Sequence, residues 1–135
     1  MKLKPKNLVT EVPTQPADKA LAHFEAKFAF ETDCWDVHAT QELGERGFVL
    51  VDVRSPEAYE RGHLPGAVNI PHWSLTEERL AEFAADTLFV TYCAGPHCNG
   101  STRGAIRFAR LGRRVKEMIG GVTGWLDEGF ELVTK

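Results

Sequence analysis

Short apolar runs alternate with amphipathic segments along most of this 135-residue chain. Residues 48–53 and 88–92 are continuous and rich in β-branched side chains, which is typical of short strands buried on both faces of a sheet. Weaker runs predict further strands at 32–37, 67–70 and 114–119. Between the strands, apolar positions recur with helical spacing. We therefore expect helices at 39–46, from Ser55 to just before Gly62, at 76–83, at 101–111 and at 122–128.

The first part of the chain is more polar than the rest. Residues 1–16 contain three prolines, and we expect them to form a flexible N-terminal arm. Apolar residues at 20, 21, 24 and 28 then have helical spacing, with Asp18 as the expected N-cap. The expected organisation is an arm at 1–16 and one compact domain at 17–135.

Strands that alternate with helices at this spacing predict an α/β fold. We expect a central, mainly parallel five-stranded sheet with helices on both faces, in three α/β/α layers. In such sheets the reactive site lies at the carboxyl ends of the strands. Two predicted strands bring polar or nucleophilic residues to that edge, namely Asp52 and Arg54 from one and Cys93 from the other.

Composition narrows the functions that this fold is expected to support. The apolar fraction is 43%, the charged fraction 26% and the net charge −3, as in soluble globular proteins. This balance offers no attraction to nucleic acid or to an anionic membrane, and no stretch approaches the roughly 20 apolar residues of a membrane span. The three cysteines argue against a disulfide framework and for a reducing compartment. We expect a cytoplasmic monomer or weak homodimer, with no nucleic-acid or membrane partner.

Candidate chemistry is concentrated where the strand at 88–92 gives way to the helix at 101–111. Cys93 directly follows the strand, and a second thiol, Cys98, lies in the loop before the helix. Backbone N–H groups and the helix dipole at a helix N-terminus favour a thiolate, which is the nucleophilic form of cysteine. We therefore place the candidate site in this loop. No residue pattern calls for a metal or a cofactor.

Three motifs lie at or near the predicted carboxyl edge. The first is Asp-Val-Arg-Ser-Pro-Glu-Ala-Tyr at 52–59, followed by Gly-His-Leu-Pro-Gly-Ala-Val-Asn-Ile-Pro at 62–71. The second is Tyr-Cys at 92–93 with its loop, and the third is Met-Ile-Gly-Gly at 118–121, with Trp125 four residues on. Together they resemble the rhodanese homology domain, the sulfurtransferase fold, over residues 31–130.

The resemblance implies both an activity and a set of site residues. In that family a cysteine at the end of the fourth strand attacks a sulfane-sulfur donor such as thiosulfate or a persulfide, and a thiol or cyanide acceptor then takes the sulfur from the cysteine persulfide. A protein thiol is included among these acceptors. Amides of the loop stabilise the anion without a metal or cofactor. The resemblance implies supporting roles for Asp52 and Arg54, and substrate-binding roles for the loop residues Ala94, Gly95, Pro96, His97, Asn99, Gly100, Ser101 and Arg103.

The loop departs from the family pattern. The usual spacing is a cysteine, four residues and then often an arginine, which Cys98 and Arg103 satisfy, whereas Cys93 lies ten positions before Arg103. Strand position favours Cys93, because the fold determines where the strand ends while loops accept insertions. We prefer Cys93 as the nucleophile and keep Cys98 as the alternative nucleophile or a resolving thiol. In the resolving case oxidation would join the two as a disulfide; otherwise Cys98 is a small packing residue.

Five further residues have structural interpretations, some of them beside a functional one. Asp52 and Arg54 are expected to form a salt-bridged pair or to support the loop, with Arg54 also able to attract anionic donors. Arg103 could bind the anionic end of a donor or be a solvated helix residue. His63 and Cys34 are expected to be structural.

Two other function classes remain open at the level of the sequence. His-Cys-Asn-Gly-Ser-Thr-Arg at 97–103 resembles the phosphatase loop of His, Cys, five residues and Arg, but one residue is missing, so phosphate or arsenate chemistry is the alternative. Many rhodanese-like domains are non-catalytic binding modules that have lost the nucleophile. Because both cysteines are present here, the sequence favours the sulfurtransferase.

Overall fold

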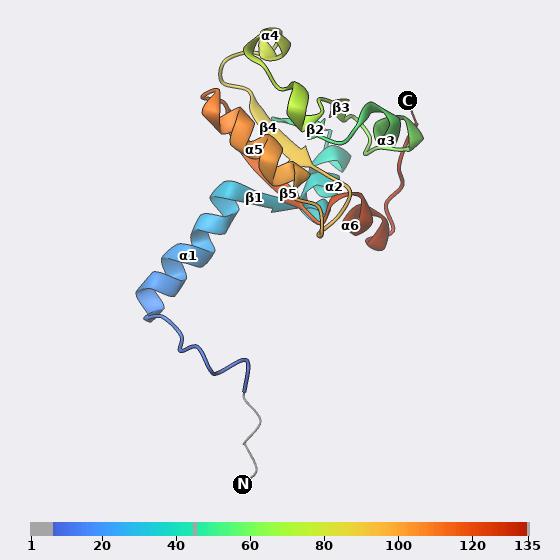
Figure 1. Ribbon diagram of the computed structural model, residues 1–135. Helices are drawn as coiled ribbons and strands as arrows, with labels where there is room; N and C mark the ends of the chain where they lie inside the picture. Colours follow the sequence, from blue (N-terminus) through green and yellow to red (C-terminus); the bar gives the residue numbers. More distant parts are fainter. Residues whose placement is uncertain (1–6, 45, 135) are drawn as a thin grey trace.

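The structure is a computed structural model that describes residues 7–44 and 46–134. Within these ranges five strands form one all-parallel sheet in the order β1-β5-β4-β2-β3 (Figure 1). The strands are β1 (Glu31–Asp33), β2 (Val49–Asp52), β3 (Val68–Asn69), β4 (Leu88–Tyr92) and β5 (Arg114–Ile119). The predicted three-layer α/β/α fold with a five-stranded parallel sheet is confirmed. The central strands β4 and β2 are short and apolar, as expected for strands covered on both faces.

Helices cover both faces of the sheet. One face carries α5 (Gly100–Arg110), beside which lie η1 (His72–Ser74) and α4 (Glu77–Leu80). The other carries α2 (Cys34–Glu42) and α6 (Gly121–Asp127), while α3 (Pro56–Arg61) joins β2 to β3.

Each face of the sheet has its own apolar core, because side chains alternate along a strand. Leu50 and Val90 pack with Trp125 on the α2 and α6 side. Val51 and Phe89 pack with Phe108 on the α5 side. This double burial holds the carboxyl ends of β2 and β4 side by side, in the register Asp52 to Tyr92.

Most predicted elements are confirmed, and two strands match residue for residue, at 88–92 and 114–119. The helix from Ser55 is α3, with the Ser55 side chain accepting the Ala58 N–H at 3.2 Å. The expected helix at 76–83 is shorter, since α4 ends at Leu80.

The predicted strand at 32–37 is wrong beyond Asp33. The Asp33 carboxylate accepts the Asp36 N–H at 2.8 Å, so Asp33 is a helix N-cap and Cys34 begins α2. The expected helix at 39–46 is therefore the second half of α2, which ends at Glu42; residue 45 lies outside the described residues. Cys34 is buried on a helix rather than on a strand.

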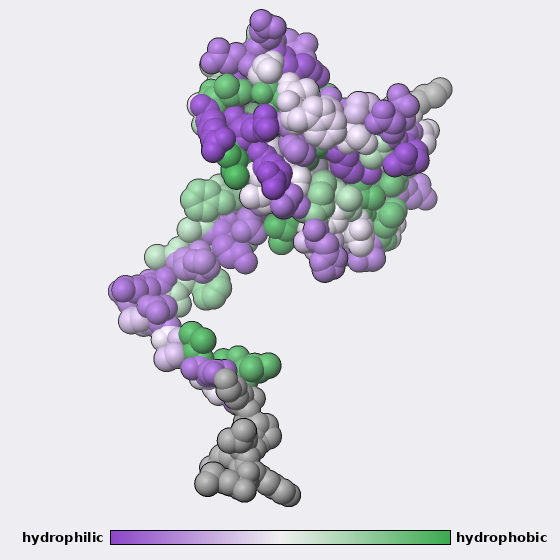
Figure 2. Space-filling model, viewed as in Figure 1, coloured by the Kyte–Doolittle hydropathy of each residue, from purple (hydrophilic) through white to green (hydrophobic). Residues whose placement is uncertain are grey.

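Helix α1 (Ala17–Phe30) projects from the body of the molecule (Figure 1). It begins after Pro16, which makes no side-chain cap, so the expected capping role of Asp18 is wrong; Asp18 lies in the first turn. No side chain of α1 is buried, and apolar side chains lie among hydrophilic ones along this arm (Figure 2). Residues 7–16 of the expected flexible arm contain no helix or strand, and residues 1–6 lie outside the described residues.

Across residues 7–44 and 46–134, no helix combines the length and the apolar character needed to cross a membrane.

Candidate active site

The loop between β4 and α5 is fixed to the start of α6. The Cys93 carbonyl accepts the Val122 N–H at 3.0 Å, and the Ala94 carbonyl accepts the N–H and hydroxyl of Thr123 at 2.9 and 3.1 Å. A Cβ at Gly121 would lie 2.5 Å from the Cys93 carbonyl oxygen, and Gly121 has a φ of +61°. Only glycine permits this approach with that backbone conformation, so the Gly-Gly pair in the third motif positions the cysteine loop.

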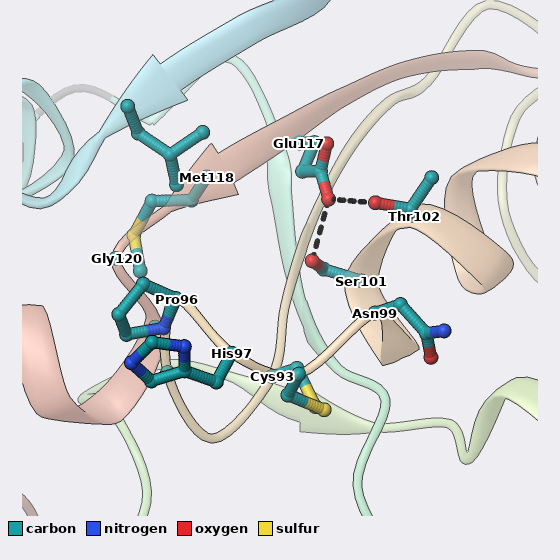
Figure 3. Close-up of a pocket in the computed structure, with 13 residues that line it drawn as sticks. Cys93, Pro96, His97, Asn99, Ser101, Thr102, Glu117, Met118 and Gly120 are labelled. Atoms are coloured by element: carbon teal, nitrogen blue, oxygen red, sulfur yellow. Dashed lines mark hydrogen bonds between the residues drawn. A yellow bond between two sulfur atoms is a disulfide. The ribbon is translucent and has the colours of Figure 1, made fainter. Parts of the chain in front are cut away.

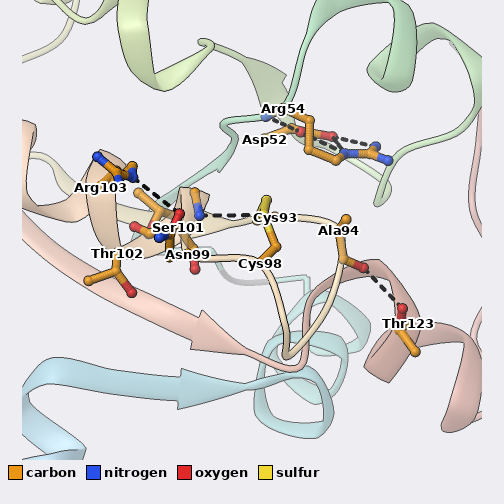
Figure 4. Close-up of a disulfide and its surroundings, with 12 residues drawn as sticks. Asp52, Arg54, Cys93, Ala94, Cys98, Asn99, Ser101, Thr102, Arg103 and Thr123 are labelled. Carbon is orange, nitrogen blue, oxygen red and sulfur yellow. Dashed lines mark hydrogen bonds and ion pairs between the residues drawn. A yellow bond between two sulfur atoms is a disulfide. The ribbon is translucent and has the colours of Figure 1, made fainter.

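The two loop cysteines form a disulfide in this structure, with their Cα atoms 6.4 Å apart (Figure 4). Cys93 is 6% exposed and packs in the core on the α5 side, whereas Cys98 is only half-buried. The Cys98 N–H donates to the Gly95 carbonyl at 3.1 Å, a turn that carries Cys98 back towards Cys93. The structure therefore brings together the two cysteines that the sequence predicted as the candidate site.

Both sulfurs lie at the amino end of α5. The Gly100 N–H donates to Cys98 Sγ at 3.4 Å, and a Cβ at Gly100 would lie 2.8 Å from Cys93 Sγ. This 11-residue helix presents its free N–H groups and positive dipole end to the sulfurs. Such a position favours the thiolate form of either cysteine once the disulfide is reduced.

Asp52 and Arg54 form an ion pair near the loop, in which Asp52 is buried and Arg54 is partly buried (Figure 4). Arg54 Nη2 lies 2.7 Å from Asp52 Oδ2 and also donates to the Gly62 carbonyl at 2.7 Å. The Tyr92 hydroxyl donates to Asp52 Oδ2 at 2.8 Å and accepts the Leu64 N–H at 3.1 Å. Burial, with the adjacent Asp52 charge, raises the pKa of Tyr92 above its ordinary range. Arg54 is thus committed to Asp52 and Gly62 in this structure.

A pocket of about 300 Å³ opens beside the cysteine loop, and Figure 3 shows its lining. Inside it Glu117 Oε2 accepts the hydroxyls of Ser101 and Thr102, both at 2.6 Å. Sequence reasoning missed Glu117 and Thr102, although a glutamate near the carboxyl end of β5 was the available signal. The lining consists of Cys93, Gly95, Pro96, His97, Cys98, Asn99, Ser101, Thr102, Glu117, Met118, Ile119, Gly120 and Gly121.

Most of the remaining predicted residues are exposed. Arg103 is exposed, and its Nε donates to Asn99 Oδ1 at 3.1 Å, one helical turn back. His97 and Ala94 are exposed, and Asn99 precedes α5 without capping it. His63 is buried and stacks on Tyr59. Among the described residues, no group of three or more His, Cys, Asp or Glu side chains is arranged to hold a metal ion.

This architecture and loop correspond to a known family. A family model described as the rhodanese-like domain matches residues 37–128, more than half of the chain. The chain belongs to the rhodanese-like family.

Two named relatives differ in kind. This rhodanese-like chain is 44% identical over 93 residues to the HTH-type transcriptional regulator Rv0324 of Mycobacterium tuberculosis, a match that covers 68% of the chain and 39% of that regulator's length. It is 34% identical over 92 residues to the thiosulfate sulfurtransferase GlpE of Pseudomonas syringae pv. syringae, with 68% of the chain and 77% of the relative covered.

Solved structures share the fold. The BH2092 protein of Bacillus halodurans superposes with a TM-score of 0.84 at 39% identity, covering 87% of this chain and 86% of that one. Residues 31–135 make up less than 87% of the chain. The structural alignment with BH2092 therefore also includes part of α1. The rhodanese-like domain of the Anabaena protein Alr3790 has a TM-score of 0.69 at 24% identity, with 78% and 79% covered.

Proposed function

We propose that this rhodanese-like protein is a sulfurtransferase that carries sulfane sulfur as a persulfide on Cys93 and passes it to a thiol acceptor. The observation that carries the proposal is the position of Cys93, at the carboxyl end of β4 and against the amino end of α5. A thiolate there is stabilised by backbone N–H groups and the helix dipole, and so is the terminal sulfur of a persulfide. The similarity to a thiosulfate sulfurtransferase supports this chemistry.

The pocket favours sulfur chemistry over phosphate or arsenate chemistry. An oxyanion site needs donors directed at the anion, but the hydroxyls of Ser101 and Thr102 donate to the Glu117 carboxylate, and Arg103 is bonded to Asn99. A carboxylate in the pocket also repels a dianion. The same charge favours a donor of low negative charge, such as an alkyl persulfide, over thiosulfate.

The test is detection of the persulfide on a defined cysteine. The Cys98→Ser variant is reduced, desalted and incubated with thiosulfate or glutathione persulfide, and the intact mass is measured. We expect a gain of about 32 Da, the mass of one sulfur atom, removed by cyanide with formation of thiocyanate. The Cys93→Ser/Cys98→Ser double variant should gain no mass. Cys34→Ser should behave as the wild-type protein.

Two outcomes would contradict the proposal. An adduct that forms on Cys93→Ser and not on Cys98→Ser would transfer the nucleophilic role to Cys98. No adduct on either variant, with several donors, would favour a non-catalytic binding module.

A further inference from the structure

The loop holds two thiols in bonding contact, although sulfur transfer through one persulfide uses only one of them. We propose that Cys98 resolves the persulfide on Cys93, releasing sulfide and leaving the Cys93–Cys98 disulfide present in this structure. This inference rests on the proposed function, since it begins with the Cys93 persulfide. The protein would then be a reductase of sulfane sulfur that is reset by a dithiol.

The reaction balances in three steps. The Cys93 thiolate takes the outer sulfur of thiosulfate, and sulfite leaves. The Cys98 thiolate then attacks Cys93 Sγ, the S–S bond of the protonated persulfide breaks, and its outer sulfur leaves as HS⁻. The transferred sulfur is reduced, and the two cysteines are oxidised to the disulfide. A dithiol finally reduces the disulfide and becomes a cyclic or protein disulfide itself.

The loop geometry suits the second step. The turn from Gly95 to Cys98 brings the second sulfur to the first, and Gly100 leaves room for both. The nearest atom to a Cβ at Gly104 would be Val53 Cγ1, at 2.9 Å, so Gly104 does not make room for the sulfurs. Carbonyl contacts to Val122 and Thr123 fix the chain at Cys93 and Ala94. Resolution therefore requires movement of Cys98 alone.

The unequal exposure of the two cysteine residues suits the third step. An external thiolate reaches the half-buried Cys98, whereas Cys93 is 6% exposed. Attack on Cys98 releases Cys93 as a thiolate at the amino end of α5, where the helix dipole stabilises a leaving anion. The reductant is thus directed to one sulfur, and the nucleophile is regenerated in its reactive form.

The experiment is a single turnover with thiosulfate and no added thiol. Reduced, desalted wild-type protein is mixed with excess thiosulfate, and sulfite, sulfide, free thiols and intact mass are followed. We expect about one sulfite and one sulfide per chain, with a mass loss of about 2 Da for the new disulfide. Cys98→Ser should release sulfite without sulfide, and Cys34→Ser, the matched control, should match the wild type.

The two proposals fail differently. Sulfite release and a stable adduct on the wild type, without sulfide, would overturn the resolving role and leave sulfur transfer standing. Release of sulfide by Cys98→Ser equal to that of the wild type would also overturn it. Absence of both sulfite and sulfide, together with no sulfur adduct or sulfide from glutathione persulfide, would overturn the proposed function together with this inference.

A second, independent observation concerns the projecting helix α1. Ala17, Leu21, Phe24 and Phe28 recur with 4-3-4 spacing, and the three larger side chains are 61–76% exposed. A groove of about 320 Å³ runs beside this face, from Phe24 and Phe28 to Ile119 on β5. Within the described residues, no segment of the chain covers this face enough to bury a side chain of α1.

The total exposed area of the chain bears on what covers this face of α1. The chain exposes 9375 Å², whereas a compact monomer of 15.0 kDa exposes roughly 7,000 Å². Residues 7–16 and every side of α1 contribute to this excess, and a standard interface needs only roughly 800 Å² of it per partner. We infer that α1 packs against α1 and its groove in a second copy of this chain, because a self-complementary apolar helix closes a two-fold dimer.

Sedimentation analysis of the full chain between about 1 and 200 μM tests this, a range that spans the dissociation constants of weak dimers held by about 5–8 kcal/mol. We expect a concentration-dependent dimer, lost in Phe24→Glu/Phe28→Glu. The control Ala22→Glu adds a charge on the opposite side of α1 and should remain dimeric. A wild-type chain that is monomeric throughout, or a dimer that survives the double substitution, would overturn the inference.

Discussion

The buried hydroxyl of Tyr92 provides a quantitative test of how the site is supported. Tyr92→Phe removes a donor to Asp52 Oδ2 at 2.8 Å and the acceptor of the Leu64 N–H at 3.1 Å. A hydrogen bond to a charged group contributes about 1.5–3 kcal/mol, and an orphaned buried N–H costs about 1–3 kcal/mol. Because Arg54 still pairs with Asp52, we take the lower part of the combined range, about 2.5–4 kcal/mol of unfolding free energy.

The assay is equilibrium urea unfolding of the reduced protein, followed by tryptophan fluorescence. Tyr59→Phe is the matched control, because its half-buried hydroxyl donates only to the neutral Ala67 carbonyl at 2.9 Å and its loss should cost about 1 kcal/mol. A loss for Tyr92→Phe no larger than that for Tyr59→Phe would refute the argument that the buried carboxylate makes this network costly to break.

Three further predictions concern the loop and its surroundings. Glu117→Gln removes a negative charge from the pocket and should raise kcat/KM for thiosulfate several-fold relative to an alkyl persulfide; equal changes for both donors would contradict this. Gly100→Ala places a methyl group 2.8 Å from Cys93 Sγ, so disulfide formation should slow about tenfold or more, while Gly104→Ala should slow it less. Burial, with the charges of Asp33 and Glu128, raises the pKa of Cys34 to about 11 from an ordinary 9.0. Stability should therefore fall as pH rises from 9 towards 11, because only the unfolded thiol ionises at the lower end, and a melting-temperature profile that is the same in Cys34→Ala would contradict this.

The sheet was predictable because its strands carry their own signal. Leu88–Tyr92 and Arg114–Ile119 have the predicted bounds. The first is a continuous run of strand-forming residues, and the second, although weaker, lies between Gly112 and Gly120, which limit where it can begin and end. The strand at 32–37 failed for a local reason. One carboxylate, at Asp33, accepts the N–H three residues on, and this capping bond outweighs the strand preference of Trp35 and Val37.

The site was predictable only in part, because some of its residues lie far apart along the chain. Cys93 and Cys98 are five residues apart, so a single loop necessarily brings them near each other. Glu117 reaches Ser101 and Thr102 only because β5 pairs with β4, and that pairing depends on the whole sheet. The Tyr92 hydroxyl likewise bonds to Asp52 on the neighbouring strand, and neither local segment predicts this contact by itself.

The contact of Arg103 bears on the choice between the two cysteines. The spacing of Cys98 and Arg103 resembles that of an anion-binding loop, yet Arg103 Nε donates to Asn99, four residues back, as side chains one turn apart on a helix do. Because Arg103 is bonded to Asn99, the spacing alone is no evidence that Cys98 is the nucleophile. Strand position still favours Cys93, while greater exposure and the Gly100 N–H suit Cys98 to meet a second thiol. The proposed division of labour, with Cys93 as nucleophile and Cys98 as resolving thiol, is consistent with both sets of contacts.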